Sequence, residues 1–198
     1  SFSDNHSDGS LNNWTGHGAR TWSESSGSVS PQVGTTNQGF LLHNTMPDAD
    51  GTFSAKITAD HWSGENGGLV FRWNSSSQFY FVSVTPNNPG SGTLYFVKNS
   101  RDVSTGIKIN QSLTLGTTFD LAVELNGSNF TFYINGVNVG SHFDASYANG
   151  LLGYGYSSSW HSYTKFLKMD WVGVSSSIAI QSQPTSDTLV VGASHYFS

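Results

Sequence analysis

The sequence contains no cysteine and few charged residues, and each shortage excludes a class of protein. Without cysteine, disulfide bonds and thiolate zinc sites are excluded. Only 11% of the 198 residues are charged, with 8 Lys and Arg against 13 Asp and Glu. A chain with a net charge of −5 offers no basic patch for phosphates, so we expect no nucleic-acid partner. No apolar run approaches the roughly 18 residues of a membrane span, so we expect no membrane segment.

Aromatic residues and glycine are abundant instead, at 14% of the chain and 22 residues respectively. A surface built from Ser, Asn, Thr and Gly is typical of a secreted, extracellular protein that meets neutral, hydroxyl-rich partners. The chain begins at Ser1 without methionine, and we interpret it as a mature fragment or an excised module. Its length suits one domain with a sizeable core.

Strand patterns recur along the chain, whereas the 3.6-residue period of a helix is never sustained. The runs are rich in β-branched and aromatic residues and are separated by Ser, Asn, Gly and Pro. We expect strands at 39–45, 51–62, 69–73, 78–85, 93–99, 117–127, 129–140, 149–156 and 164–175. Asn135-Gly136 is a hairpin signal. Many short strands without helices predict an all-β, two-sheet antiparallel β-sandwich.

The strands between residues 67 and 100 carry apolar residues on both alternating faces, although packing on one core needs only one apolar face. One face of each strand is expected between the sheets, and the other on a second surface. In the run 78–84, we expect Tyr80, Val82 and Val84 in the core and Phe79 and Phe81 outward.

Two cations guide the orientation of the neighbouring strands. Arg72 is not expected to point unpaired into an apolar core, so we expect its side chain to face the second surface. Its alternative role is an ion pair with Glu65 or Asp60. In the run 93–99, Lys98 favours an outward direction for Leu94 and Phe96.

The order of these runs resembles the concanavalin A-like jelly roll. The resemblance rests on "FSDNHSDGSLNNW", "GGLVFRWN", "QFYFVSV", "GTLYFVKN", "FDLAVELNGSNFTFYINGVNVG" and "FLKMDWVGV", which follow one another between Phe2 and Ser175. Laminin-G-like domains and levanase-type carbohydrate-binding modules are the most similar families. The resemblance implies two curved antiparallel sheets, with sugar bound on the concave sheet or its rim loops.

The composition of the sequence changes after Val174, where a run of serines begins. We therefore expect a jelly-roll domain over 1–176, and a linker followed by the start of another β module, Ig-like in character, over 177–198. The alternative is a tail that packs back on the same domain.

The resemblance implies a noncatalytic carbohydrate-binding module of a secreted, bacterial, polysaccharide-degrading enzyme. Its partner would be a polysaccharide or oligosaccharide, and the chain would be a monomeric module within a longer protein. An adhesion domain of the laminin-G type is the alternative. A glycoside hydrolase or polysaccharide lyase domain is the less favoured third reading.

Two loops carry the residue types that bind sugars, because aromatic rings stack on sugar faces and polar groups hold hydroxyls. "DHWSGEN" contains Trp62 and Glu65, and "SSSWHSYTK" contains Trp160, His161 and Tyr163. The two tryptophans can equally cap the ends of the sandwich. On the strands themselves, we expect Arg72 and Phe81 to contribute to the same site.

An active site is not indicated by the sequence. Glycosidases normally use two carboxylates that flank the scissile bond. Asp120 and Glu124 share one strand, but that strand resembles the convex back sheet, which favours a solvated pair. A lyase that uses His161 and Tyr163 remains open.

The chain ends suggest a structural Ca²⁺. Related jelly rolls hold calcium with an acidic residue of the last strand and backbone oxygens near the N-terminus. By that resemblance, Asp170 in "KMDWVGV", Asp4 in "FSDN" and the carbonyl of Gly39 are the expected ligands, and carboxylate and carbonyl oxygens suit this ion. The alternative is an exposed Asp170 that is hydrogen-bonded to backbone.

Overall fold

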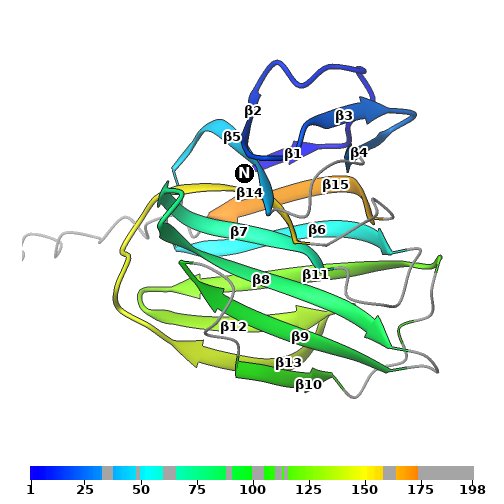
Figure 1. Cartoon of the computed structure of the whole chain (residues 1–198). Coiled ribbons are helices and arrows are strands. Elements are labelled where there is room, and N and C mark those ends of the chain that lie inside the picture. Colours follow the sequence, from blue (N-terminus) through cyan, green and yellow to red (C-terminus); the bar gives the residue numbers. More distant parts are fainter. Residues whose placement is uncertain are drawn as a thin grey trace, which may run out of the picture.

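The fold consists of strands and turns throughout the part of the chain that the computed structural model describes, which comprises residues 1–32, 38–47, 50–59, 66–87, 91–99, 105–109, 113, 116–157 and 164–173. Two antiparallel sheets stack on each other (Figure 1). The predicted all-β sandwich is therefore confirmed. Within the described ranges we find no helix with the length and apolar character of a membrane span.

The eight-stranded sheet contains both the N-terminal strand and the last described strand. Its order is β13 (Val137–Phe143), β12 (Asn129–Ile134), β11 (Thr118–Asn126), β6 (Gly51–Ala59), β15 (Thr164–Gly173), β4 (Ser28–Pro31) and β3 (Trp22–Ser25), with β1 (Phe2–Asp4) paired to β15. The strands β1 to β4 gather at one end of the sandwich, drawn in blue at the top of Figure 1.

The seven-stranded sheet contains the central strands of the sequence. Its order is β10 (Thr105–Ile109), β9 (Ser91–Lys98), β8 (Gln78–Asn87), β7 (Asn66–Ser75), β14 (Leu151–Ser157), β5 (Gly39–Pro47) and β2 (Trp14–Gly18). The expected strands between residues 39 and 173 are all present. Five short strands, most of them rich in Ser, Gly and Thr, were not expected from the sequence: β1, β2, β3, β4 and β10.

The main core lies between the two sheets. β11 shows why the sequence forms this layer: Phe119, Leu121, Val123 and Leu125 alternate with more exposed residues and are all buried. The hairpin that joins β12 to β13 turns at Asn135-Gly136, where both residues have positive φ, at 49° and 77°. A two-residue turn of this kind requires positive φ at both positions, which confirms the sequence signal.

Candidate functional site

The seven-stranded sheet has a second apolar layer on the face turned away from the eight-stranded sheet, which we call its outer face. The layer is a cluster of buried residues from β5, β7, β8 and β9: Phe40, Leu42, Val70, Trp73, Phe79, Phe81 and Val97. The expected alternation of β8 is confirmed, because Tyr80, Val82 and Val84 lie in the main core whereas Phe79 and Phe81 lie on the outer face. The apolar residues on both alternations thus serve two separate layers.

Aromatic rings in this outer cluster pack against one another. Trp73 stacks on Phe79 with ring centroids 4.8 Å apart, and Phe40 lies 4.7 Å from Trp73 and 4.9 Å from Phe79. Phe81 meets Phe40 edge-on at 6.2 Å. Such contacts add about 0.5–1.5 kcal/mol per pair beyond the burial of area, so the rings form a fixed floor.

Gly155 of β14 allows the ring of Phe81 to lie close to the backbone of the sheet. A Cβ atom at this position would lie only 2.5 Å from Cε2 of Phe81 and 2.8 Å from Cγ2 of Val70. Both neighbours belong to the outer cluster, so the glycine is required by the close approach of an aromatic ring to the backbone.

The structure corrects the expected direction of Arg72. Its side chain is only 2% exposed, and Nη1 donates a hydrogen bond of 2.8 Å to the carbonyl of Tyr147. Nη2 donates to the carbonyl of Gly127, and the guanidinium lies 4.9 Å from the ring centroid of Phe130 on β12. Arg72 is therefore buried on the side of the other sheet instead of facing the outer surface.

The reason for this reversal is the backbone of Arg72 itself, which has a φ of 52° in the left-handed region. The pairing of β7 with β8 is irregular between Phe71 and Ser75, so the alternation of the strand breaks there. Trp73 consequently takes the outward position that the simple alternation gave to Arg72.

The expected direction of Leu94 and Phe96 is also wrong, because both lie in the main core. Lys98 stands on their side of β9 at the end of the strand, where its Nζ donates a hydrogen bond of 3.0 Å to Oδ2 of Asp144. A lysine on the core side is tolerated because it reaches a carboxylate at the margin of the sandwich.

A hydrogen-bond network around Asp144 supports this end of the sheet. Oδ1 of Asp144 accepts hydrogen bonds from the hydroxyl of Tyr80 at 2.7 Å and from the backbone N–H of Ser146 at 2.8 Å. Burial opposes ionisation of Asp144, but the hydrogen bonds from Ser146, Tyr80 and Lys98 outweigh it and hold the pKa of the carboxyl well below its usual value. Burial and the bond to Asp144 raise the pKa of Tyr80 to about 12.

Phe81 lies on the expected face, but its exposure of 1% means that it supports the floor and offers no open ring face to a ligand. Two ring-bearing side chains of the outer face are more accessible than this floor, His17 of β2 and Tyr95 of β9, both half-buried. His17 lies 5.6 Å from the ring of Trp73, and Tyr95 pairs with the buried Ser83. These two side chains combine an aromatic ring with hydrogen-bonding groups.

The five expected rim residues Trp62, Glu65, Trp160, His161 and Tyr163 lie outside the described residues, and their roles stay predictions. The expected boundary at 177 and the segment 177–198 lie outside as well. Sequence reasoning missed Phe40 and Trp73 as members of the outer layer. The alternation of "GFLLHNT" contained the signal for Phe40, because Phe40 and Leu42 oppose Leu41 and His43.

The expected calcium ligands Asp4, Asp170 and Gly39 do not form one donor set. β1 pairs with β15, and Asp4 stands opposite Met169. Because neighbouring residues of a strand point to opposite faces, Asp4 lies on the side of the buried Met169 and Asp170 on the other. Gly39 belongs to β5 in the other sheet.

The carboxylates of this region also have other partners. Asp4 accepts hydrogen bonds from the backbone N–H of His6 at 2.8 Å and from Nε1 of Trp14 at 2.9 Å, and Asp170 lies 2.9 Å from Nζ of Lys168. In the described part of the chain there is no group of three or more His, Asp or Glu side chains capable of holding a metal ion. The three expected residues do not fit a calcium site, which corrects that ligand set.

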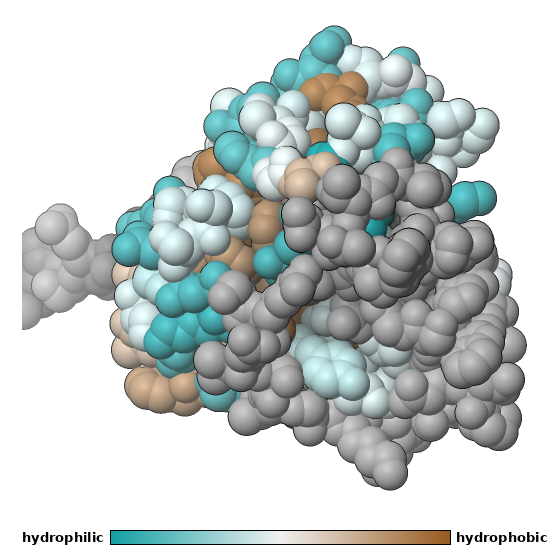
Figure 2. All heavy atoms as spheres, viewed as in Figure 1, coloured by the Kyte–Doolittle hydropathy of each residue, from teal (hydrophilic) through white to brown (hydrophobic). Residues whose placement is uncertain are grey.

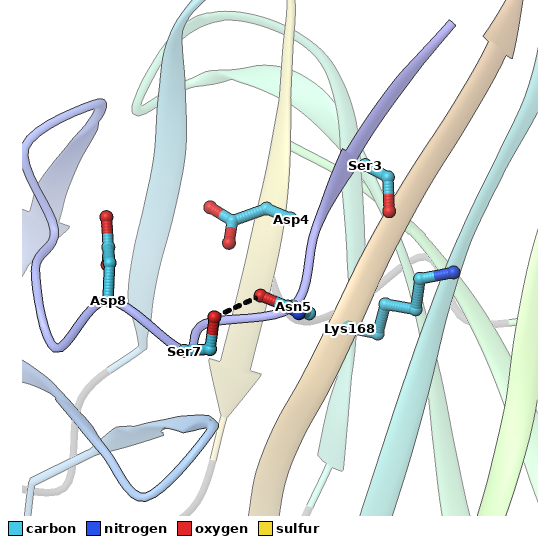
Figure 3. Close-up of a pocket in the computed structure, with 6 residues that line it drawn as sticks. All are labelled: Ser3, Asp4, Asn5, Ser7, Asp8 and Lys168. Atoms are coloured by element: carbon cyan, nitrogen blue, oxygen red, sulfur yellow. Dashed lines mark hydrogen bonds between the residues drawn. The ribbon is translucent and has the colours of Figure 1, made fainter.

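A polar pocket of about 390 Å³ lies beside β1. It is lined by Ser3, Asp4, Asn5, Ser7, Asp8 and Lys168. Figure 3 shows the side chain of Asp4 pointing away from that of Lys168, and the hydroxyl of Ser7 donating to Oδ1 of Asn5 at 2.7 Å. Asp8 accepts a hydrogen bond from the backbone of Ser10, so its carboxylate organises the loop.

The seven-stranded sheet is free of carboxylates: none of its described strands contains an aspartate or glutamate. Asp120 and Glu124 lie on β11 of the other sheet, where Asp120 pairs with the exposed Lys56 at 3.0 Å and Glu124 accepts a hydrogen bond from Tyr133. Along β11 they lie opposite the buried Phe119, Leu121, Val123 and Leu125, as the alternation predicted. Within the described strands of the seven-stranded sheet there is thus no carboxylate pair of the kind that glycoside hydrolysis normally uses.

No family model matches the chain, and no curated protein matches it in sequence. Solved structures do share its architecture. The carbohydrate binding module CBM66 from Bacillus subtilis superposes with a TM-score of 0.62 at 19% identity, over 80% of this chain and 96% of that chain.

Two further structures with other activities superpose equally well. A Bacillus licheniformis β-glucanase gives a TM-score of 0.64 at 6% identity, over 87% of this chain and 98% of its own. The exoplasmic/lumenal domain of VIP36, in a form bound to Ca²⁺ and Man3GlcNAc, gives 0.64 at 10% identity, over 87% and 88%. At such identities the likeness establishes architecture, and this chain has the concanavalin A-like jelly-roll fold.

Proposed function

We propose that this chain is a noncatalytic carbohydrate-binding domain of a secreted, polysaccharide-degrading enzyme, and that glycan binds at the outer face of the seven-stranded sheet. The observation that carries the proposal is the second aromatic layer on a sheet whose described strands contain no carboxylate. Structures of the same fold include a carbohydrate binding module and a glycan-bound lumenal domain, which supports the ligand class.

The chemistry of the outer face favours binding over hydrolysis. Half-buried side chains such as His17 and Tyr95 stand beside a fixed aromatic floor, so they have little conformational freedom left to lose when a ligand binds. His17 and Tyr95 would hold sugar hydroxyls. Trp62 and Trp160 would stack on sugar faces, and Glu65, His161 and Tyr163 would add hydrogen bonds from the rim loops. A small ligand makes few contacts, so we expect a Kd on the order of 10–1000 µM.

The surroundings of this domain are also part of the proposal. We propose a monomeric module in an extracellular protein, with a polysaccharide or oligosaccharide as its partner. Calcium binding stays a proposal as well, with ligands other than the set Asp4, Asp170 and Gly39.

A glycan array followed by calorimetry tests the proposed function. A defined oligosaccharide is expected to bind, and Tyr95→Ala and Trp160→Ala are each expected to weaken it about fivefold or more, the scale of a lost stacking or hydrogen-bonding contact. Lys56→Ala, on the outer side of the other sheet, serves as the matched control and should bind as the wild type does.

Three results would count against the proposal. Binding to matrix proteins with no glycan hit favours an adhesion domain. Shortened products after incubation with polysaccharides, seen by mass spectrometry, indicate an enzyme. If Tyr95→Ala and Trp160→Ala both bind the glycan with wild-type affinity, the glycan does not bind at the outer face.

A further inference from the structure

A second cleft opens at the edge of the sandwich, between the terminal strands of the two sheets. β2 ends the seven-stranded sheet and β3 ends the eight-stranded sheet, and the two follow each other in the chain. The cleft between them has a volume of about 390 Å³, and its walls include Leu11, Trp14, Gly16, Arg20, Trp22 and Leu41. Figure 2 shows an apolar area on the N-terminal part of the molecule, at the top of the view, within a mostly hydrophilic or neutral described surface.

One wall of the cleft is held rigidly by Trp14. Its ring stacks on that of Tyr154 with centroids 5.3 Å apart and planes 9° from parallel, and its Nε1 donates to Asp4. Leu41 beside it is buried in the main core. Because these contacts fix the wall before any ligand arrives, little ordering is required on binding.

The opposite wall is Trp22, which has an unused hydrogen-bond donor. Cδ1 of Trp22 lies 3.5 Å from the position that a Cβ of Gly16 would take, so the pyrrole edge of the indole faces β2. Nε1 belongs to that edge, and it is buried without a hydrogen-bond partner. Because Nε1 is buried, it is out of reach of a ligand in the cleft, and the partly exposed indole contributes the apolar face of its ring.

The charges around the cleft favour a neutral occupant. Among the described residues that line it there is no aspartate or glutamate, and Arg20 is the one cation. Arg20 is nearly buried, donates from Nη1 to the carbonyl of Gln32 at 3.1 Å and lies over the ring of Tyr156 at 4.8 Å. A charged ligand would therefore find no free counter-ion on these walls.

The edges of the two strands add backbone groups to the polar surface. Among the described strands, β2 pairs with β5 alone and β3 with β4 alone, so each has one edge outside the ladder that these strands form. An edge strand presents N–H and C=O groups that suit the hydroxyls of a sugar. The volume stands near the lower end of the roughly 300–1,000 Å³ typical of small-ligand sites.

We propose that this cleft is a separate subsite that binds one neutral sugar ring, stacked on Trp22 with its hydroxyls held by the backbone groups of the edge strands. The ligand class rests on the proposed function, but the location does not, because the cleft lies between the sheets' edges and the outer face is elsewhere. Uronic acids are expected to bind less well than neutral hexoses.

Filling the cleft provides the sharpest test, because Gly16 is open enough to accept a side chain. Its Cβ would make only an ordinary contact with Trp22, so Gly16→Leu should fold and occupy the cleft. Thr52→Leu places the same leucine at an exposed position of β6 as the matched control. Trp22→Ala removes the ring on which the sugar stacks. Melting temperatures establish that each variant is folded.

The probes are methyl glycosides of neutral hexoses and methyl glucuronide, studied by ligand-observed NMR and calorimetry. At least one neutral glycoside is expected to bind the wild type, Thr52→Leu and Tyr95→Ala alike. Its affinity should fall about tenfold or more in Gly16→Leu and about five- to tenfold in Trp22→Ala, the scale of one lost stacking contact.

Several outcomes would overturn the subsite. The first is that folded Gly16→Leu binds the glycoside with wild-type affinity. The second is that the glucuronide binds more tightly than the neutral sugars. The third is that no methyl glycoside binds, while Gly16→Leu retains the hit of the glycan array. In the last case the proposed function stands and only the subsite fails. A different result would contradict only the outer-face assignment. In that case the glycoside binds the wild type and is lost in Gly16→Leu, but Tyr95→Ala changes the affinity for no glycan.

Discussion

Replacement of Arg72 by methionine separates two roles for this residue, structural anchor and ligand contact. The substitution removes hydrogen bonds to the carbonyls of Tyr147 and Gly127 and the contact with the ring of Phe130. Hydrogen bonds to a charged group contribute about 1.5–3 kcal/mol each, and a cation–π contact about 0.5–2 kcal/mol. Methionine keeps much of the apolar stem and avoids several kcal/mol of guanidinium desolvation.

The balance of these effects is a loss of about 2–4 kcal/mol, since the two carbonyls are left without their donor. For a chain of 150–250 residues, each kcal/mol lowers the Tm by about 2–4 °C, so we expect a fall of about 4–16 °C. Calorimetric melting measures it. Lys56→Met is the control, because its ion pair with Asp120 is half exposed and is worth at most about 1 kcal/mol.

Glycan affinity provides the second readout for the same variant. If Arg72 is an anchor, folded Arg72→Met below its melting transition should bind glycan nearly as the wild type does. A variant that melts no lower than Lys56→Met but has lost glycan binding would refute the buried position, and with it the reversal of β7 at this residue.

Three further predictions concern Asp144, Gly155 and the proposed calcium ion. Asp144→Asn should cost about 1.5–3 kcal/mol at pH 7, since it weakens the bonds from Tyr80 and Lys98. Because the pKa of Asp144 is depressed in the folded state, its ionised form stabilises the fold above the ordinary carboxyl pKa of about 3.9. The difference in unfolding free energy between the wild type and the variant, measured with urea, should therefore shrink as the pH falls below about 4. A difference that does not depend on pH would contradict this. Gly155→Ala should lose about 1–3 kcal/mol because its Cβ meets Phe81, whereas Gly16→Ala should melt as the wild type does, and equal melting of both would show that the ring does not lie over Gly155. If the proposed calcium ion is bound, added Ca²⁺ should raise the Tm above its value in EDTA, and identical melts together with no calcium by elemental analysis would dismiss it.

The sequence by itself determined the longer strands and most of the core. In β11 and β8 the period of two separates buried from exposed residues without help from distant parts of the chain, and the Asn135-Gly136 turn is local. The presence of apolar residues on both faces of the central strands also indicated a second layer. The absence of carboxylates from those strands is likewise a property of the sequence.

Only the tertiary structure decided where the two strand cations point. Arg72 leaves the alternation through one left-handed backbone position, and its acceptors Gly127 and Tyr147 stand 55 and 75 residues further along the chain. Lys98 faces the core side because Asp144, 46 residues away, meets it at the margin. The rule that charged side chains avoid an apolar core is correct for unpaired charges, but the partners that satisfy a charge come from other strands, and no local pattern specifies them.

The cleft between β2 and β3 was not predicted from the sequence. Trp14 is part of the core, and Trp22 packs against it. What makes a cleft there is the assignment of two consecutive strands to different sheets, which leaves an open edge between them. Strand formation depends on local alternation, whereas sheet membership depends on which distant strand supplies hydrogen bonds, so the first is set by the sequence locally and the second only by the folded chain.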